Sequence, residues 1–206
     1  MKNILKIQLI TSILFTLFLL IGCSDNVNEK NSVSLRVIDS SSDLAKESII
    51  DTENYSIVNV SIIRIELTGE DTVIVLDDYT ADPLIINLMD LGIAGSLLVD
   101  GAELPLGTYN KVRMILDAPE EQNQAPVNPA SFLTLEGDAT EYPIFVPSGA
   151  QTGLKINLTP PIELVDGSSF EIVFDFNSEN TINKTGQNDR YIIRPTSMSA
   201  TITDNS

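Results

Sequence analysis

The sequence predicts an all-β protein built as a two-sheet antiparallel β-sandwich, immunoglobulin- or prealbumin-like in arrangement. From Val33 onward, runs of about five to ten residues rich in Val, Ile, Leu, Phe and Thr alternate between two faces. Gly, Pro, Asp and Asn separate these runs, and no long amphipathic helix pattern interrupts them. About eight to ten short strands at this spacing are typical of two sheets that pack their apolar faces together.

The first two predicted strands contain one irregularity that the fold must absorb. Residues 33–37 alternate cleanly between apolar and polar side chains. In the run at 57–67, Val58, Val60 and Ile62 share one face, and from Ile63 onward the apolar positions are odd-numbered. Because a slip of one residue turns every later side chain to the other face, we predict a β-bulge between Ile62 and Ile63. The alternative is a strand that passes from one sheet to the other.

The middle of the chain predicts a hairpin, a short strand and a helical turn. Residues 69–71 form a tight turn into a strand at 72–76, which pairs with the strand before the turn. Residues 85–88 form a short strand. Residues 89–98 are apolar without clean alternation, so we expect a helical turn there.

The next strand is introduced by a turn with a recognisable tyrosine. Residues 104–109 contain Pro105 and Gly107 before Tyr109, a pattern that resembles a tyrosine corner, in which the hydroxyl ties a loop crossing. In the strand that follows, the apolar side chains from Val112 face inward while Lys111 and Arg113 face outward. Residues 118–129, with three prolines, form the longest predicted loop.

The C-terminal part predicts three more strands. Residues 154–158 alternate, and we expect Pro160 and Pro161 to break that strand because proline has no N–H to donate. A turn at 166–167 leads into a strand at 170–176. Residues 178–189 predict a polar loop. Residues 191–202 predict the last strand, in which Pro195 marks an edge or a bulge.

The N-terminus carries an export signal. Lys2 and Lys6 precede an almost wholly apolar stretch at 7–21, which is too short for a comfortable membrane-spanning helix. It ends in Leu-Ile-Gly before Cys23, a sequence that resembles the lipobox of bacterial lipoproteins. The resemblance implies that diacylglycerol alkylates the Cys23 thiol, that residues 1–22 are cleaved as a signal peptide, and that the new N-terminus is acylated, with palmitate as the expected acyl chain.

The expected organisation follows from this cleavage. Residues 23–32 form the lipidated cysteine and a flexible polar tether, and residues 33–203 form a single β-sandwich domain. We expect attachment to the membrane through Cys23, in the cell envelope and at the outer membrane. The sequence leaves open whether the domain faces the periplasm or the cell surface.

The charge excludes some classes of partner. Without Lys2 and Lys6 the chain keeps 10 of its 12 basic side chains against 29 acidic ones, a net charge of −19. Nucleic acid is therefore not an expected partner, because phosphate binding needs a basic surface. A glycan or an envelope protein stays open as a partner.

Five blocks of sequence resemble one family of exported domains. These blocks are residues 55–67, 101–116, 146–157, 170–176 and 191–195. They resemble the lipoprotein domain catalogued as domain of unknown function 4382, many members of which come from bacteria of the Bacteroidetes type. The chain departs from the family pattern after its first strand, where a longer segment that includes residues 38–43 replaces a compact turn. The resemblance implies a β-sandwich and export, and it implies no activity.

The composition removes most catalytic chemistry. The chain has no histidine, and its one cysteine is expected to carry lipid, so the usual general base and the usual zinc ligands are missing. No Gly-rich phosphate loop or Gly-x-Ser-x-Gly turn occurs. We therefore predict no enzymatic activity and no catalytic residues. The least favoured alternative is a glycoside hydrolase that uses paired carboxylates.

Calcium is the metal that the composition best suits, because it takes carboxylate and carbonyl oxygens from loops. No cofactor is expected otherwise. None of the acidic clusters has the spacing of a twelve-residue calcium loop. The candidate pairs are Asp39 with Asp43, Asp77 with Asp78, and Glu136 with Asp138.

The sequence thus favours a lipid-anchored, non-catalytic binding or interaction module whose ligand is open. The alternative is a structural or adhesin-type accessory subunit of the surface. An exposed aromatic cluster, to which Tyr55, Tyr79, Tyr142 and Tyr191 could contribute, would favour glycan binding. An exposed apolar strand edge would favour assembly by strand addition.

Overall fold

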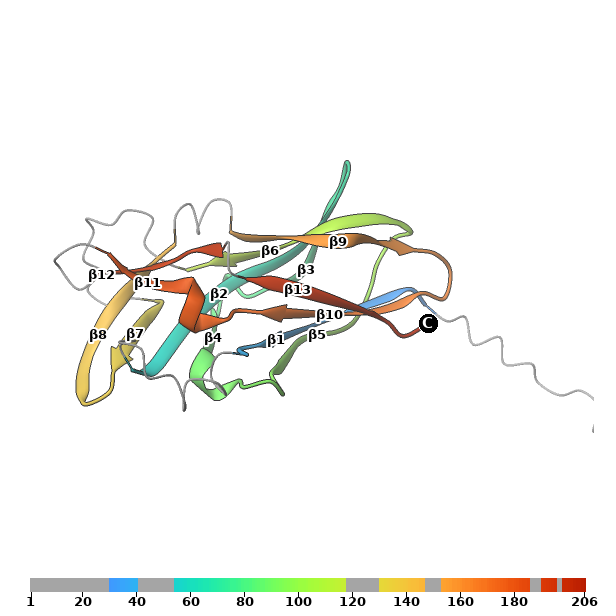
Figure 1. Ribbon diagram of the computed structural model, residues 1–206. Coiled ribbons are helices and arrows are strands. Elements are labelled where there is room, and N and C mark those ends of the chain that lie inside the picture. Colours follow the sequence, from blue (N-terminus) through green and yellow to red (C-terminus); the bar gives the residue numbers. More distant parts are fainter. Residues whose placement is uncertain (1–29, 41–53, 118–129, 147–152, 186–189, 196–197) are drawn as a thin grey trace, which may run out of the picture.

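The protein is a sandwich of two facing β-sheets, as predicted (Figure 1). The computed structural model describes residues 30–40, 54–117, 130–146, 153–185, 190–195 and 198–206. These residues contain thirteen strands, one four-residue helix, α3 (Ser178–Thr181), and one 3-10 turn, η1 (Leu88–Asp90). The predicted helical turn within 89–98 is therefore confirmed, although strand β5 (Ser96–Glu103) begins inside the same segment.

The smaller sheet has four strands in the order β13–β10–β1–β5. They are β1 (Ser32–Ile38), β5 (Ser96–Glu103), β10 (Ser169–Asp175) and β13 (Ser199–Asp204). β1 and β10 run parallel, and so do β8 (Asp138–Phe145) and β12 (Arg190–Ile193) in the other sheet, so the prediction of antiparallel sheets was wrong for these two pairs. Parallel neighbours need a long connection, and the chain between β1 and β10 passes through β5 and seven strands of the other sheet.

The larger sheet has nine strands. Its main path is β11–β12–β8–β7–β2–β6–β9, with β3 and β4 also paired to β2. The bounds are β2 (Tyr55–Gly69), β3 (Val73–Asp78), β4 (Leu84–Asn87), β6 (Gly107–Leu116), β7 (Phe132–Leu135), β8 (Asp138–Phe145), β9 (Leu154–Leu164), β11 (Ile182–Thr185) and β12 (Arg190–Ile193).

The predicted irregularity in β2 is a bulge. The register with β6 shifts between Ile62 and Arg64, while β2 stays in one sheet. The even-numbered apolar side chains up to Ile62 and the odd-numbered ones from Ile65 are therefore all buried. Ile63 is the residue that the bulge accommodates, and it is partly exposed.

Two predictions about prolines needed correction. Pro160 and Pro161 do not end β9, because pairing with β6 resumes at Ile162 after a register shift. The prolines lie in the unpaired bulge, where no ladder N–H is required. The predicted last strand is two strands, β12 and β13, which belong to different sheets and lie on either side of Pro195.

Other strands were not predicted. The hairpin of β7 and β8 turns at Gly137, and the segment expected as a polar loop after residue 178 contains α3 and β11. β8 and β11 carry many polar side chains and few buried ones, and β7 has only four residues, so their sequences lack the alternation that identifies β1 or β10.

The core fills the space between the sheets. The predicted inward face of the strand from Val112 is confirmed, because Val112, Met114 and Leu116 of β6 are fully buried. From the other sheet, β1 buries Val33, Leu35 and Val37 completely, and β10 buries Ile172 and Phe174. The tyrosine corner is also confirmed, because the Tyr109 hydroxyl donates to the carbonyl oxygen of Pro105 at 2.9 Å. Burial raises the pKa of Tyr109.

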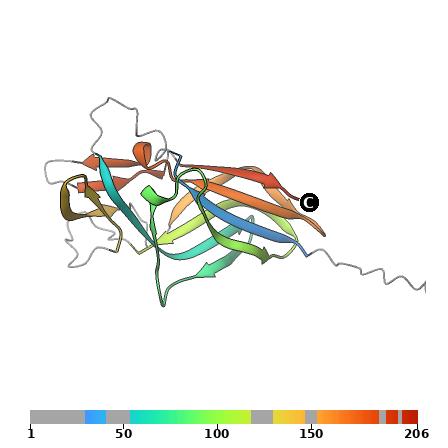
Figure 2. The same ribbon diagram turned by 90° about the horizontal axis from the view of Figure 1, so that it is seen from below.

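The two ends of the sandwich differ. β1 starts beside β10 and the C-terminal residues, since Ser32 N donates to Ser168 O and Asn205 N donates to Ser169 O. The strands β7, β8, β11 and β12 form the opposite end, where the larger sheet extends beyond the smaller one (Figures 1 and 2). The described chain therefore enters and leaves at one end of the molecule.

Gly95 is expected to be essential for stability. It has φ +64°, and a Cβ there would overlap the carbonyl oxygen of Val37 and the side chain of Ile38. We expect Gly95→Ala to lower the free energy of unfolding, measured by urea denaturation, by more than about 3 kcal/mol. Gly101→Ala is the control, because Gly101 has φ +57° with nothing within 4 Å of the added Cβ. It should cost about 1–2 kcal/mol, and equal losses would refute the role of the Val37 contact.

Candidate functional site

The structure describes some, but not all, of the residues predicted to carry lipid or to bind calcium. Cys23 and Asp43 lie outside the described residues. Asp39 is fully buried at the end of β1, and its Oδ1 accepts a hydrogen bond from Ser178 N at 3.1 Å. This contact ties β1 to the start of α3, which gives the carboxylate a structural role.

The other two acidic pairs lie at strand ends, Asp77 and Asp78 at the end of β3 and Glu136 and Asp138 around the start of β8. Asp77 Oδ1 accepts from Asp78 N, and Asp78 Oδ1 accepts from Thr80 N, each at 2.9 Å. Hydrogen bonds from the side chain and backbone of Thr80 lower the pKa of Asp78. Burial, together with the neighbouring Asp77, raises the pKa of Tyr79 to about 12.

Glu136 and Asp138 flank the turn between β7 and β8. Glu136 Oε2 accepts from Asn54 Nδ2 at 3.1 Å, while Asp138 accepts from Thr140 N and from the Tyr142 hydroxyl. Hydrogen bonds from the Thr140 side chain, which has the largest effect, from the Tyr142 hydroxyl and from Thr140 N lower the pKa of Asp138. Within the described residues no group of three acidic side chains could hold a metal ion, and calcium binding at these pairs stays a prediction.

Three of the four tyrosines named above lie together. Tyr191 packs edge-on against Tyr55 and Tyr142, with ring centroids 6.2 and 5.7 Å apart. Tyr191 is fully buried and the other two are half-buried, so the cluster is packed interior and not an exposed stacking surface. Tyr79 lies elsewhere, and its hydroxyl donates to Leu98 O.

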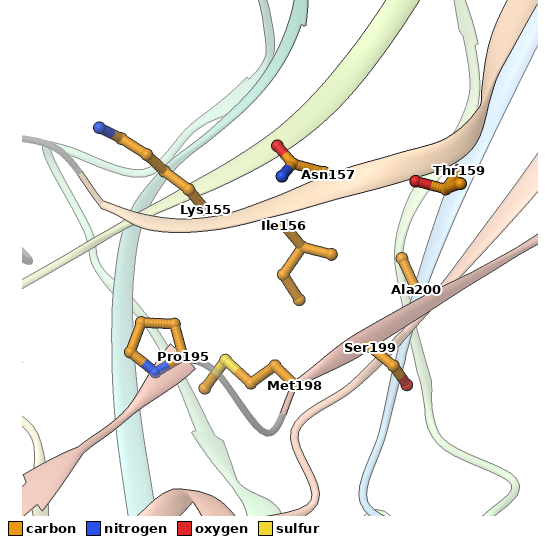
Figure 3. A pocket seen from close by; sticks show the side chains of 8 residues that line it. All are labelled: Lys155, Ile156, Asn157, Thr159, Pro195, Met198, Ser199 and Ala200. Atoms are coloured by element: carbon orange, nitrogen blue, oxygen red, sulfur yellow. The ribbon is translucent and has the colours of Figure 1, made fainter.

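A groove lies where the two sheets meet along one side (Figure 3). β9 is the last strand on one side of the larger sheet and β13 is the last strand on one side of the smaller sheet. The groove between them has a volume of about 370 Å³. Ile156, Pro195 and Met198 supply its apolar lining, and Lys155, Asn157, Thr159 and Ser199 supply its polar lining.

This groove was not predicted from the sequence. Its two walls are about forty residues apart in the chain, and Lys155 and Ser199 look like ordinary exposed strand residues in their own segments. They come together because Pro195 separates β12 from β13, which places β13 in the other sheet. The described lining contains amide, hydroxyl and ammonium groups and no carboxylate.

An ion-pair network lies on the outer face of the larger sheet. Glu66 on β2 is 4% exposed, and its carboxylate oxygens are 2.8 Å from Arg64 Nε and 2.7 Å from Arg113 Nη1. Arg113 lies on the neighbouring strand β6, directly opposite Glu66. This network neutralises a carboxylate that would otherwise be costly to bury.

The sequence matches one family model. Residues 31–195 match the family described as Domain of unknown function (DUF4382). The chain belongs to this family. No match to a curated protein or to a solved structure was found. The DUF4382 match includes β9 and ends at Pro195, so Met198, Ser199 and Ala200 on the β13 wall of the groove lie beyond it.

No helix in the described ranges is long and apolar enough to span a bilayer. The apolar stretch at 7–21, on which the export prediction rests, lies outside those ranges.

Glu66 is expected to stabilise the domain. Glu66→Ala would leave two arginines beside each other without the carboxylate, and we expect a loss of about 2–3 kcal/mol in the free energy of unfolding. Glu103→Ala is the matched control, because Glu103 pairs with Lys30 on the surface, where both side chains are more than half exposed. Chemical denaturation should show little change for that variant. If Glu103→Ala lost as much stability as Glu66→Ala, the expectation that the buried Glu66 network stabilises the fold more than the surface ion pair would be contradicted.

Proposed function

We propose that this DUF4382 protein is a lipid-anchored envelope protein whose β-sandwich acts as a non-catalytic binding module. The observation that carries the proposal is the groove between β9 and β13. Its volume of about 370 Å³ lies within the usual range for small-ligand sites, which is roughly 300–1,000 Å³. A few polar groups at the rim of an apolar floor are a usual means of orienting a ligand in such a site.

The chemistry of the lining supports binding without catalysis. Lys155 and Asn157 offer hydrogen-bond donors, and Thr159 and Ser199 offer hydroxyl groups that donate or accept. A glycoside hydrolase needs two facing carboxylates, and a serine hydrolase needs a base beside its nucleophile. The described lining offers neither arrangement, which favours a binding module over an enzyme.

The position of the tether supports anchoring at one end. Cys23 precedes Lys30 by seven residues, which span at most about 25 Å when fully extended. The described chain enters the sandwich at β1, beside the C-terminus. A lipid on Cys23 would therefore hold that end near the membrane and direct β7, β8, β11 and β12 away from it.

One observation favours the alternative, a structural or adhesin-type accessory subunit. Among the described strands, β3 pairs with β2 alone, and its Val73 and Val75 are 51% and 50% exposed. A strand at the edge of a sheet with exposed apolar side chains is a site at which another chain can add a strand. This alternative predicts association through β3 and no requirement for the groove.

Lipidation is tested by Cys23→Ala. We expect the wild-type protein to incorporate labelled palmitate and to begin at Cys23, and the variant to incorporate none and to keep its signal peptide. Mass spectrometry of the N-terminal peptide measures both. An unlabelled wild-type protein, or one cleaved elsewhere, would contradict the anchor. Protease added to intact cells then separates the two faces, because a surface domain is digested and a periplasmic one is protected.

Binding in the groove is tested by Ser199→Trp, which places an indole at the β13 rim of the groove. Thr201→Trp is the control, because Thr201 is exposed on the same strand and does not line the groove. The full-length lipidated protein in detergent is screened by saturation-transfer NMR against soluble oligosaccharides and extended peptides. We expect Ser199→Trp to lose at least about tenfold in affinity and Thr201→Trp to keep it. No binding by the wild-type protein would favour the structural alternative.

A further inference from the structure

The positive charges of this acidic protein are unevenly placed. The chain has 12 basic and 29 acidic side chains, yet four of its cations lie on three neighbouring strands of one sheet. They are Arg64 on β2, Lys111 and Arg113 on β6, and Lys155 on β9. A local concentration of positive charge on a strongly negative chain needs a reason other than solubility.

The strand register places these side chains on one outer face. Arg113 lies opposite Lys155, and Lys111 lies opposite Asn157. Residues that oppose each other in register point to the same face of a sheet. The residues between them, Val112 and Ile156, point into the core, so this face is turned to solvent. Lys155 and Asn157 are exposed and Lys111 and Arg113 are half-buried.

Lys111, Arg113, Lys155 and Asn157 thus form a cationic rectangle. Its sides are about 7 Å along a strand and about 5 Å between strands. The acid next to it is Glu66, opposite Arg113 on β2, and its carboxylate is shared between Arg113 and Arg64. Three ammonium or guanidinium groups and one amide therefore face outward together, and one shared carboxylate offsets them in part.

The rectangle borders the groove. Lys155 and Asn157 lie on β9, which also forms one wall of the groove, but their side chains point to the opposite side of the strand from Ile156 (Figure 3). A linear ligand lying on this outer face would meet the cations of β6 and β9 and then, farther along β9, the hydroxyl group of Thr159, which is also exposed. Such a ligand would carry negative groups at intervals and uncharged acceptors between them.

We propose that the cationic rectangle binds a linear acidic polysaccharide, with Lys111 and Lys155 as the principal contacts to its carboxylate groups. This inference rests on the proposed binding function and names its ligand class. An acidic polysaccharide with one charge per sugar meets less repulsion from the net charge of −17 than duplex nucleic acid, which carries one charge per about 1.7 Å, or an anionic bilayer. The rectangle has no aromatic or large apolar side chain, which makes it a poor anchor for a protein partner.

The test uses the full-length lipidated protein in neutral detergent and labelled polygalacturonate as the probe. We expect binding at low salt that weakens as salt is raised, as for any contact between cations and a polyanion. Lys111→Gln/Lys155→Gln should lose at least about tenfold in affinity and show a smaller salt dependence. Methyl-esterified polygalacturonate, which keeps the sugar backbone and loses the charge, should bind at least tenfold more weakly to the wild-type protein.

The control variant is Lys30→Gln/Lys184→Gln, which removes the same charge from positions outside the rectangle. Lys30 precedes β1 and Lys184 lies on β11. An equal loss of affinity in this variant would overturn the proposal, because the binding would then follow net charge. Binding of phosphatidylglycerol vesicles through Lys111 and Lys155, without binding of polygalacturonate, would overturn it in favour of a lipid surface.

The same experiment separates failure of this inference from failure of the binding function. A wild-type protein that binds neutral oligosaccharides or peptides in a Ser199-dependent way, and does not bind polygalacturonate, would refute the acidic ligand alone. A wild-type protein that binds none of these probes would refute both.

Discussion

β2 is the strand on which the rest of the sandwich depends. It forms backbone ladders with β3, β4, β6 and β7, and each of the five residues from Arg64 to Thr68 has a partner on both β3 and β6. A central strand of this length can keep one apolar face only if its twist and phase are adjusted along the way. The bulge after Ile62 makes that adjustment, and it keeps Ile62 and Ile65 in the same core.

The position of the groove follows from how the two sheets end. β9 and β13 are terminal strands of different sheets that lie next to each other, yet no hydrogen bond joins their described backbones. The larger sheet bulges at Pro160 and Pro161 on this side, and the chain crosses between sheets at Pro195. Prolines stand where ladder N–H groups are not required, and the seam between the sheets stays open at the same place.

Charge and burial divide the polar residues into two groups. Asp39, Asp138 and Glu66 accept hydrogen bonds or ion pairs that hold turns and strands together. Lys155, Asn157 and Ser199 face outward along the seam. The second group is the better source of recognition, because its side chains remain available to a ligand while those of the first already stabilise the fold.

The sequence alone determined the fold class, the family, the β2 bulge and the tyrosine corner, because each depends on residues close together in the chain. Alternation in β1 and β10, the phase change at Ile62 and the spacing from Pro105 to Tyr109 are local patterns. The tertiary structure alone decided the parallel pairs, the separation of β12 from β13, and the groove and cationic rectangle. These join Lys111 to Lys155, and Lys155 to Ser199, through register and sheet assignment, which depend on packing between distant segments and leave no local pattern in the chain.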